Sequence, residues 1–126
     1  MRGAVCLFGA AERGTIGAPL SLHSLEEVLG KLGEPPPGTE GIYSAVQLVL
    51  FGFSLIYFRV LDEGASVADY KAGFKWLKTA PLSIMAITLP GVFDAGIMRQ
   101  ARIFCHPYHC PLLVSEKELY DYCTVR

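Results

Sequence analysis

The side chains best suited to chemistry lie in one short segment, Cys105-His-Pro-Tyr-His-Cys110. Thiolate and imidazole groups are ligands that zinc prefers in structural sites, but such sites usually draw ligand pairs from two separate elements. Here Cys105, His106, His109 and Cys110 are close neighbours in the sequence. The other interpretation is a helix C-terminus, stopped by Pro107 and with both histidines near its negative end. We expect no metal here, and a disulfide only if the two Cα atoms lie within about 7 Å.

Nucleophilic catalysis is the second chemistry that these residue types allow. A thiol of Cys105 or Cys110 could be activated by the imidazole of His23 or His106. The pattern contains neither an orienting carboxylate nor an oxyanion site that would complete such a mechanism. We therefore expect no catalytic residue, and the sequence favours a protein that is not an enzyme.

The glycine-rich segment from Gly9 to Gly17 follows an apolar run and is a candidate phosphate-binding loop. A Walker loop needs Gly-Lys-Ser/Thr directly at a helix start, and this segment lacks it. The dinucleotide fingerprint also fails, because the spacing differs and Pro19 leads into an extended segment. Asp62 and Glu63 are adjacent on a predicted turn, so we expect their carboxylates to point apart and to be solvated. These patterns predict no bound cofactor.

The charged residues favour contacts with protein over contacts with nucleic acid. The net charge is −1, which removes the electrostatic basis for non-specific binding to nucleic acid. Arg99 and Arg102 lie three apart on a predicted helix and form a small basic stripe. Glu12 and Arg13 lie in the exposed part of the glycine-rich segment. These four residues are our candidates for subunit contacts.

The composition is rich in apolar residues for a small domain. Apolar residues make up 52% of the 126 residues and charged residues 18%, against a usual ~25% charged. The surplus suggests a sheet covered on both faces, or apolar surface that meets a partner. The longest apolar stretch, residues 45–58, is shorter than the ~20 residues of a membrane-spanning helix. We expect no membrane span, reduced cysteines and a cytoplasmic location.

Strands and helices alternate along the chain. Ser24-Leu-Glu-Glu27 and Ser115-Glu-Lys-Glu118 are capping boxes, and Ser66-Val-Ala-Asp69 carries a similar signal. Predicted strands cover residues 4–8, 54–60, 82–88 and 110–115. Predicted helices cover residues 24–32, 42–51, 66–78, 94–105 and 115–122; that over 42–51 is apolar nearly all round and is expected to be largely buried. This alternation predicts a single α/β domain over residues 1–126, with a mostly parallel sheet of about four strands covered by helices.

Four motifs follow one another within residues 4–115. Phe8-Gly-Ala-Ala-Glu-Arg-Gly-Thr-Ile-Gly-Ala-Pro-Leu20 leads into Leu22-His-Ser-Leu-Glu-Glu-Val-Leu-Gly-Lys-Leu-Gly33. Leu55-Ile-Tyr-Phe-Arg-Val60 and Ile84-Met-Ala-Ile-Thr-Leu-Pro-Gly91 then each follow a predicted helix. In this order the motifs resemble the core domain of contractile tail sheath proteins.

The resemblance implies a structural protein that assembles with copies of itself into rings or a helical tube and catalyses no reaction. It also implies an inner tube protein as a partner, and a virion or phage-tail-like particle as the setting. Sheath subunits are several times longer, so the chain would be a minimal sheath-like core. Two alternatives stay open. One is a small ligand-binding or enzyme domain with a site formed by loops 9–17, 61–65 and 89–92 at the strand ends. The other is an interaction module with a Cys/His metal site.

Overall fold

β1 (Ala4–Gly9) is the central strand of the sheet, and all six of its residues are buried. The computed structural model describes residues 4–79 and 83–125. In it the strand order is β2-β3-β1-β4-β5, with β3 (Leu55–Arg59), β4 (Ile84–Thr88) and β5 (Leu112–Leu113) parallel to β1. The mostly parallel α/β fold predicted from the sequence is confirmed. The predicted first residue of the third strand, Leu82, lies outside the described residues.

The sheet has five strands instead of about four, because the extended segment β2 (Pro19–Leu22) pairs antiparallel with β3. Proline fits an edge strand, where a backbone donor can be missing without breaking the sheet. Within β2 only Leu22 is buried, so the segment lacks the continuous apolar run of the other strands. This is why its pattern predicted extended chain but no strand.

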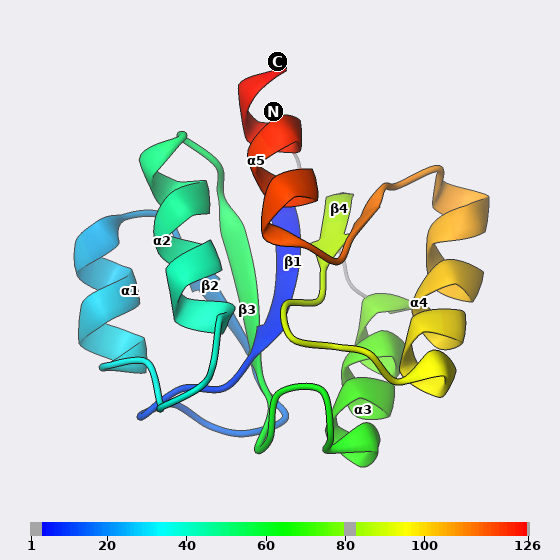
Figure 1. Cartoon of the computed structure of the whole chain (residues 1–126), viewed down its shortest axis with the longest axis horizontal. Coiled ribbons are helices and arrows are strands. Elements are labelled where there is room, and N and C mark those ends of the chain that lie inside the picture. Colours follow the sequence, from blue (N-terminus) through cyan, green and yellow to red (C-terminus); the bar gives the residue numbers. More distant parts are fainter. Residues whose placement is uncertain (1–3, 80–82, 126) are drawn as a thin grey trace.

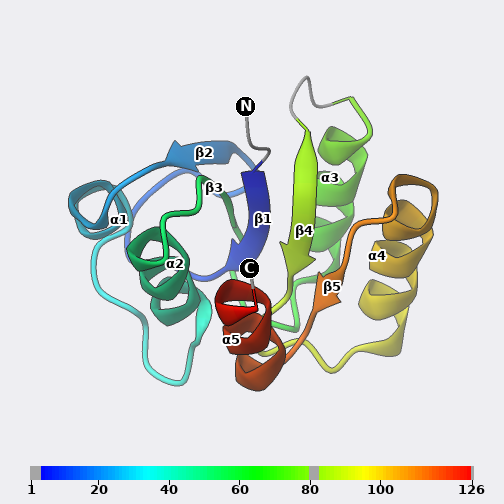
Figure 2. The ribbon, with the colours of Figure 1, turned by 90° about the horizontal axis from the view of Figure 1, so that it is seen from above.

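Helices cover both faces of the sheet (Figures 1 and 2). One face carries α1 (Leu25–Leu32), α2 (Gly41–Leu50) and α5 (Glu116–Thr124), and the other carries α3 (Val67–Leu77) and α4 (Ala95–Tyr108). Alternate side chains of β1 enter the two cores: Val5 and Leu7 face α1 and α2, whereas Cys6 and Phe8 face α3 and α4. The high apolar content therefore serves two cores.

The crossover connections place a topological switch point beside β1. The chain passes from β1 to β3 through α1 and α2, and then returns through α3 on the opposite face to β4, on the other side of β1. In open parallel sheets, ligands bind at the carboxyl ends of the strands where the order reverses in this way. The fold therefore directs attention to the loops that follow β1, β3 and β4.

The two capping boxes at Ser24 and Ser115 are confirmed, except that each glutamate bonds to the residue before the serine and not to the serine itself. The hydroxyls of Ser24 and Ser115 accept the N–H groups of Glu27 and Glu118 at 3.2 and 3.1 Å. Each glutamate carboxylate accepts the N–H group of the residue just before the serine, at 2.9 Å in both cases. Both helices thus begin where the sequence predicts.

The start of α3 and the end of α4 depart from the prediction. Ser66 precedes α3, but its hydroxyl makes no capping bond and instead bonds with the backbone of Asp62. Pro107 does not stop α4, which runs on to Tyr108 before the chain leaves at His109 with φ 53°. A proline in the last turn removes only one intrahelical donor, so a helix can tolerate it there.

Candidate functional site

The carboxyl ends of β1 and β3 meet at the side chain of Glu63, which lies in the turn after β3. Its Oε2 atom accepts the N–H groups of Ala10 at 2.9 Å and Gly41 at 3.0 Å, and its Oε1 atom accepts that of Glu40 at 2.7 Å. Next to it, the hydroxyl of Tyr57 donates to the carbonyl oxygen of Ala10 at 2.6 Å. One half-buried carboxylate thus joins the loop after β1, the turn after β3 and the start of α2.

Glu63 occupies the position of an anionic ligand. Glu40 and Gly41 form the N-terminal end of α2, where unpaired N–H groups and the helix dipole favour a negative charge. In doubly wound folds this crevice holds the anionic part of a bound ligand. Here the chain supplies that anion itself, which argues against an open ligand site at the strand ends.

Close backbone contacts fill the same region. The loops after β1, β3 and β4 converge, as the ligand-binding alternative predicts. However, a Cβ atom on Gly9 would lie 2.8 Å from the Cα atom of Gly41, and one on Gly64 would strike the carbonyl oxygen of Gly91. Gly64 has a φ of 80°, which also favours glycine. The loops therefore pack on one another at the place where a ligand would enter.

The role of Glu63 was not predicted, and the expectation that both turn carboxylates are solvated is wrong for this one. Asp62 is exposed, whereas Glu63 is half buried with three backbone donors. One signal was present in the sequence: α2 begins at Glu40-Gly41 without a Ser, Thr, Asp or Asn cap, and its N-cap side chain makes no capping bond. The donors at that helix start therefore need an acceptor from elsewhere in the chain.

Glu12 and Arg13 fasten the loop after β1 to the C-terminal end of α1. The N–H group of Arg13 donates to the carbonyl oxygen of Leu32 at 2.9 Å, and its Nη1 atom donates to that of Gly30 at 3.1 Å. The Oε1 atom of Glu12 accepts the N–H group of Glu34 at 3.1 Å and lies 3.6 Å from Arg13 Nε. Both side chains remain exposed, so their contact with another subunit stays a prediction.

Arg99 and Arg102 are both exposed on α4 but do not share one environment. Arg99 lines a shallow cleft of about 310 Å³ between α3 and α4, together with Lys71 and the apolar side chain of Ile103. Arg102 is not among the residues that line this cleft. The predicted basic stripe is therefore divided, and its role in subunit contacts remains a prediction.

The Cys/His segment separates into buried thiols and exposed imidazoles. Cys105 and Cys110 are buried in the core under α4, whereas His106 and His109 are exposed. The four side chains therefore do not converge on one centre. Within residues 4–79 and 83–125, no group of three or more His, Cys, Asp or Glu side chains could hold a metal ion.

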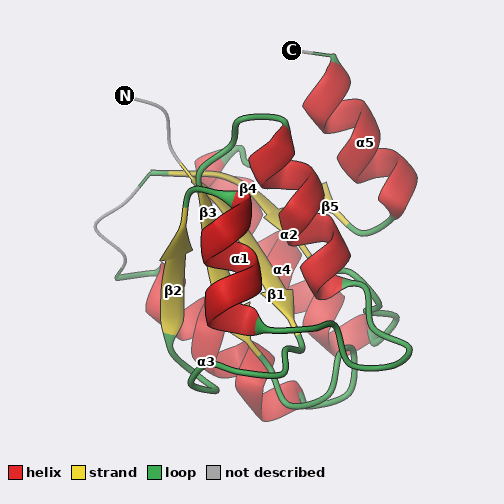
Figure 3. Ribbon diagram, turned by 90° about the vertical axis from the view of Figure 1, so that its left-hand side faces the viewer, coloured by secondary structure: helices red, strands yellow, loops and turns green. Residues whose placement is uncertain are grey.

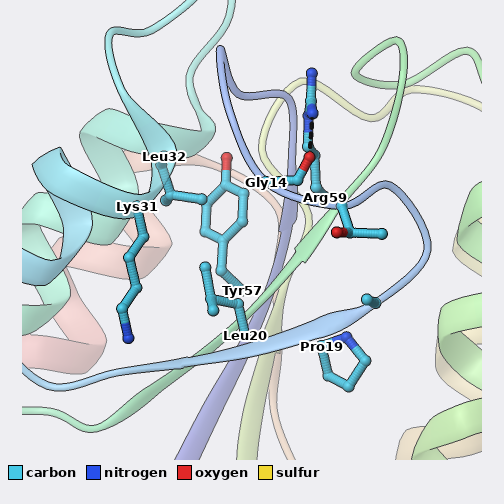
Figure 4. A pocket seen from close by; sticks show the side chains of 9 residues that line it. Gly14, Pro19, Leu20, Lys31, Leu32, Tyr57 and Arg59 are labelled. Atoms are coloured by element: carbon cyan, nitrogen blue, oxygen red, sulfur yellow. Dashed lines mark hydrogen bonds between the residues drawn. The ribbon is translucent and has the colours of Figure 1, made fainter.

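A cleft of about 340 Å³ lies between α1, β2 and the loop after β1 (Figure 4). Leu20, Leu32 and Tyr57 line it, and Arg59 lies at its side. Arg59 donates from Nη1 to the carbonyl oxygen of Gly14, and its Nε atom is buried with no hydrogen-bond partner among the described residues. The sequence did not predict this cleft, because it forms only when β2 pairs with β3.

Most residues of α2 are buried or half-buried, as predicted, but the helix also has apolar side chains that are exposed on its outer surface. Tyr43 is 65% exposed and Leu50 67%, while Phe51 at the helix end and Tyr120 on α5 are 44% and 56% exposed. Tyr43 and Leu50 are seven residues apart and therefore share one side of the helix. The rings of Phe51 and Tyr120 meet edge to face with centroids 6.3 Å apart. We call these four residues the α2 apolar face; α2 and α5 lie next to one another in Figure 3.

Among residues 4–79 and 83–125, the structure contains no helix that is long and apolar enough to cross a bilayer. Comparison of the chain with protein family models, with curated proteins and with solved structures found no match.

Proposed function

We propose that the chain is a structural protein that assembles with copies of itself into rings or a tube, on a core like that of contractile tail sheath proteins. The observation that carries the proposal is the α2 apolar face, four large apolar side chains exposed on two adjacent helices. Exposed apolar patches of this kind mark surfaces that meet a protein partner. The motif order supports a second copy of the chain as that partner.

A ring or tube needs two different surfaces on each subunit, since its contacts run head to tail. The α2 apolar face lies on one side of the sheet. The basic residues of α4, Arg99 and Arg102, lie on the other side. The exposed pair Glu12 and Arg13 belongs to a third region beside α1. This distribution suits a repeating assembly better than a closed dimer, which uses one surface twice.

The resemblance to sheath proteins extends the proposal to partner and setting. An inner tube protein is the candidate second partner, and a phage-tail-like particle or the cytoplasm is the candidate location. The net charge of −1 favours protein over nucleic acid as the partner. Neither a cofactor nor a metal takes part in the proposed function.

Sedimentation velocity across protein concentration and salt, with negative-stain microscopy of the same samples, tests the proposal. We expect species larger than a monomer, and rings or tubes in the images. Leu50→Lys should shift the distribution toward monomer, because it places a charge in the α2 apolar face. Leu61→Lys is the matched control, since Leu61 is 62% exposed but lies in the turn after β3. A strictly monomeric protein under all conditions would contradict self-assembly.

The cleft beside Arg59 favours a second candidate, a small-ligand domain. Its volume of about 340 Å³ lies in the range of small-molecule sites, and the buried Nε atom of Arg59 is a donor without a partner among the described residues. An apolar carboxylic acid would match both the lining and this donor. A rise in melting temperature with such acids, absent in Arg59→Met, would support this candidate over an assembly role.

A further inference from the structure

We propose that Cys105 and Cys110 form a redox modification site, in which a peroxide oxidises the two thiols to an intramolecular disulfide. Both thiols are reduced in the structure and are buried in the core beneath α4, with Cys6 of β1 in the same cluster. The proposal is independent of self-assembly, because it rests on the end of one helix.

The way α4 ends brings the two thiols together. His109 is left-handed, with φ 53°, and its N–H group donates to the carbonyl oxygen of His106 at 3.3 Å. The N–H group of Cys110 donates to the carbonyl oxygen of Cys105, also at 3.3 Å. These two bonds define a Schellman motif, which places the side chains at its first and last positions in contact. In this chain both of those side chains are thiols, and they lie at the two ends of the turn that the Cys110 N–H group closes onto the Cys105 carbonyl oxygen.

The two thiols are not equivalent. The thiol of Cys105 donates a hydrogen bond to the sulfur of Cys110, which lowers the pKa of Cys110 and raises that of Cys105. Burial raises the pKa of Cys6, which has no exposed surface, whereas Cys110 keeps 8% of its surface exposed. The thiolate is the reactive form of cysteine. Cys110 is therefore the first nucleophile, Cys105 resolves it, and Cys6 does not react.

The reaction balances with one peroxide for each disulfide. The Cys110 thiolate attacks one oxygen of hydrogen peroxide, the O–O bond breaks, and a sulfenic acid forms with release of hydroxide. The proton of the Cys105 thiol neutralises this hydroxide to water. The Cys105 sulfur then attacks the Cys110 sulfur, and the S–O bond breaks. Hydroxide leaves and takes up the proton that the Cys110 thiol released when it ionised, which gives a second water. The two sulfurs lose two electrons in total, and both peroxide oxygens end in water.

Peptide mapping of the folded wild-type protein tests the site directly. The protein is treated with dilute hydrogen peroxide, remaining thiols are alkylated, and the sample is digested with trypsin. Cleavage after Arg102 and Lys117 leaves both cysteines in one peptide, residues 103–117. We expect this peptide to become unalkylated and about 2 Da lighter, and to return to its reduced mass after dithiothreitol. Alkylation of Cys6 and Cys123 after unfolding should be unchanged.

Single variants separate the roles of the two thiols. In Cys105→Ser we expect Cys110 to be trapped as a sulfenic acid by dimedone, and in Cys110→Ser we expect Cys105 to stay unmodified. Cys123→Ser serves as the control in a different core and should form the disulfide at the wild-type rate. The proposal would be overturned if no disulfide formed within peptide 103–117 of the wild-type protein. Disulfide-linked dimers, or oxidation of Cys123 as fast as that of Cys110, would overturn it too. The peptide map of the wild-type protein decides the proposal by itself, so the test does not depend on whether each variant folds.

Discussion

At the residue scale, Glu63 joins three segments that are far apart in the sequence. Its carboxylate accepts N–H groups from the loop after β1 and from both residues that start α2. Tyr57 and Tyr70 surround the same region, since the Tyr57 hydroxyl donates to Ala10 and the Tyr70 hydroxyl accepts the N–H group of Gly64. The strand ends are therefore closed by polar bonds within the chain.

Replacing Glu63 by glutamine tests this closure. The amide keeps the shape but loses the negative charge and turns a donor toward backbone N–H groups. We expect Glu63→Gln to lower the free energy of unfolding by about 1–3 kcal/mol in urea denaturation. Asp62→Asn removes the exposed neighbouring charge and should change it by less than about 0.5 kcal/mol. If Glu63→Gln and Asp62→Asn changed the free energy of unfolding equally, the three backbone bonds to the Glu63 carboxylate would not contribute to stability.

The buried tyrosines predict a loss of stability in alkali. Burial raises the pKa of Tyr70 to about 12, against about 10 in the unfolded chain, and raises that of Tyr57 as well. The folded state therefore holds the Tyr70 proton more tightly, so the contribution of Tyr70 is complete below pH ~10 and is lost as pH rises through ~12. The contribution of Tyr57 persists to higher pH, because its pKa is raised further. Urea denaturation at several pH values between ~10 and ~12 gives the slope of the unfolding free energy against pH. We expect Tyr70→Phe to reduce this slope by about 1.4 kcal/mol per pH unit.

At the element scale, α3 lies against the sheet through an aromatic cluster. The ring of Phe8 on β1 lies with its centroid 5.3 Å from that of Phe58, 5.6 Å from Tyr70 and 5.0 Å from Phe74. Gly73 of α3 faces the tip of the Phe8 ring, where a side chain has no room. This contact explains a glycine in the middle of a helix, where alanine would otherwise be preferred.

Two glycine-to-alanine changes distinguish packing from helix propensity. A Cβ atom on Gly73 would strike the Phe8 ring, so Gly73→Ala should destabilise the protein by about 1–3 kcal/mol. Gly30 lies in α1 with nothing within 4 Å of its Cβ position, so Gly30→Ala should stabilise it by about 0.5–1 kcal/mol. Thermal and urea denaturation report both effects. A stabilising Gly73→Ala would mean that the Phe8 ring moves aside at little cost.

Helix starts could be predicted from the sequence because they depend on local bonds. Ser24 and Ser115 cap their helices as expected. The features that failed depend on distant segments: β2 is a strand only because β3 lies beside it, and the donors at the start of α2 bond to Glu63 across 22 and 23 residues of chain. The exposure of Leu50 could not be predicted either, since an apolar helix surface looks the same whether or not a partner covers it.

At the scale of the whole molecule, the candidate functional residues lie on the outer surface of the three-layer fold. The crevice at the switch point is filled by Glu63. The candidate surfaces are therefore the α2 apolar face, the two exposed arginines of α4, the loop of Glu12 and Arg13, and the cleft beside Arg59. Alternation of strands and helices predicted the fold class, because it depends on periodicity along the whole chain. The proposed assembly surfaces depend on a second molecule, and no pattern within one chain specifies its position.

Exchanging the charges of Glu12 and Arg13 tests the third surface while the net charge stays at −1. We expect the double variant Glu12→Arg, Arg13→Glu to assemble less in sedimentation velocity. Stability should fall by about 0.3–1 kcal/mol, because a carboxylate then replaces the guanidinium at the C-terminal end of α1. Unchanged assembly with that small loss would show that the loop only holds α1 in place.

The central position of β1 has a consequence for synthesis of the protein. β1 leaves the ribosome before β3 and β4, the two strands that flank it. At about 5–20 residues per second, roughly 3–10 s pass before β3 follows, and longer before β4 appears. During that interval a strand whose six residues are all buried in the finished fold is exposed in the nascent chain. Yield in cells should therefore depend on chaperones that shield this segment until translation has passed β4.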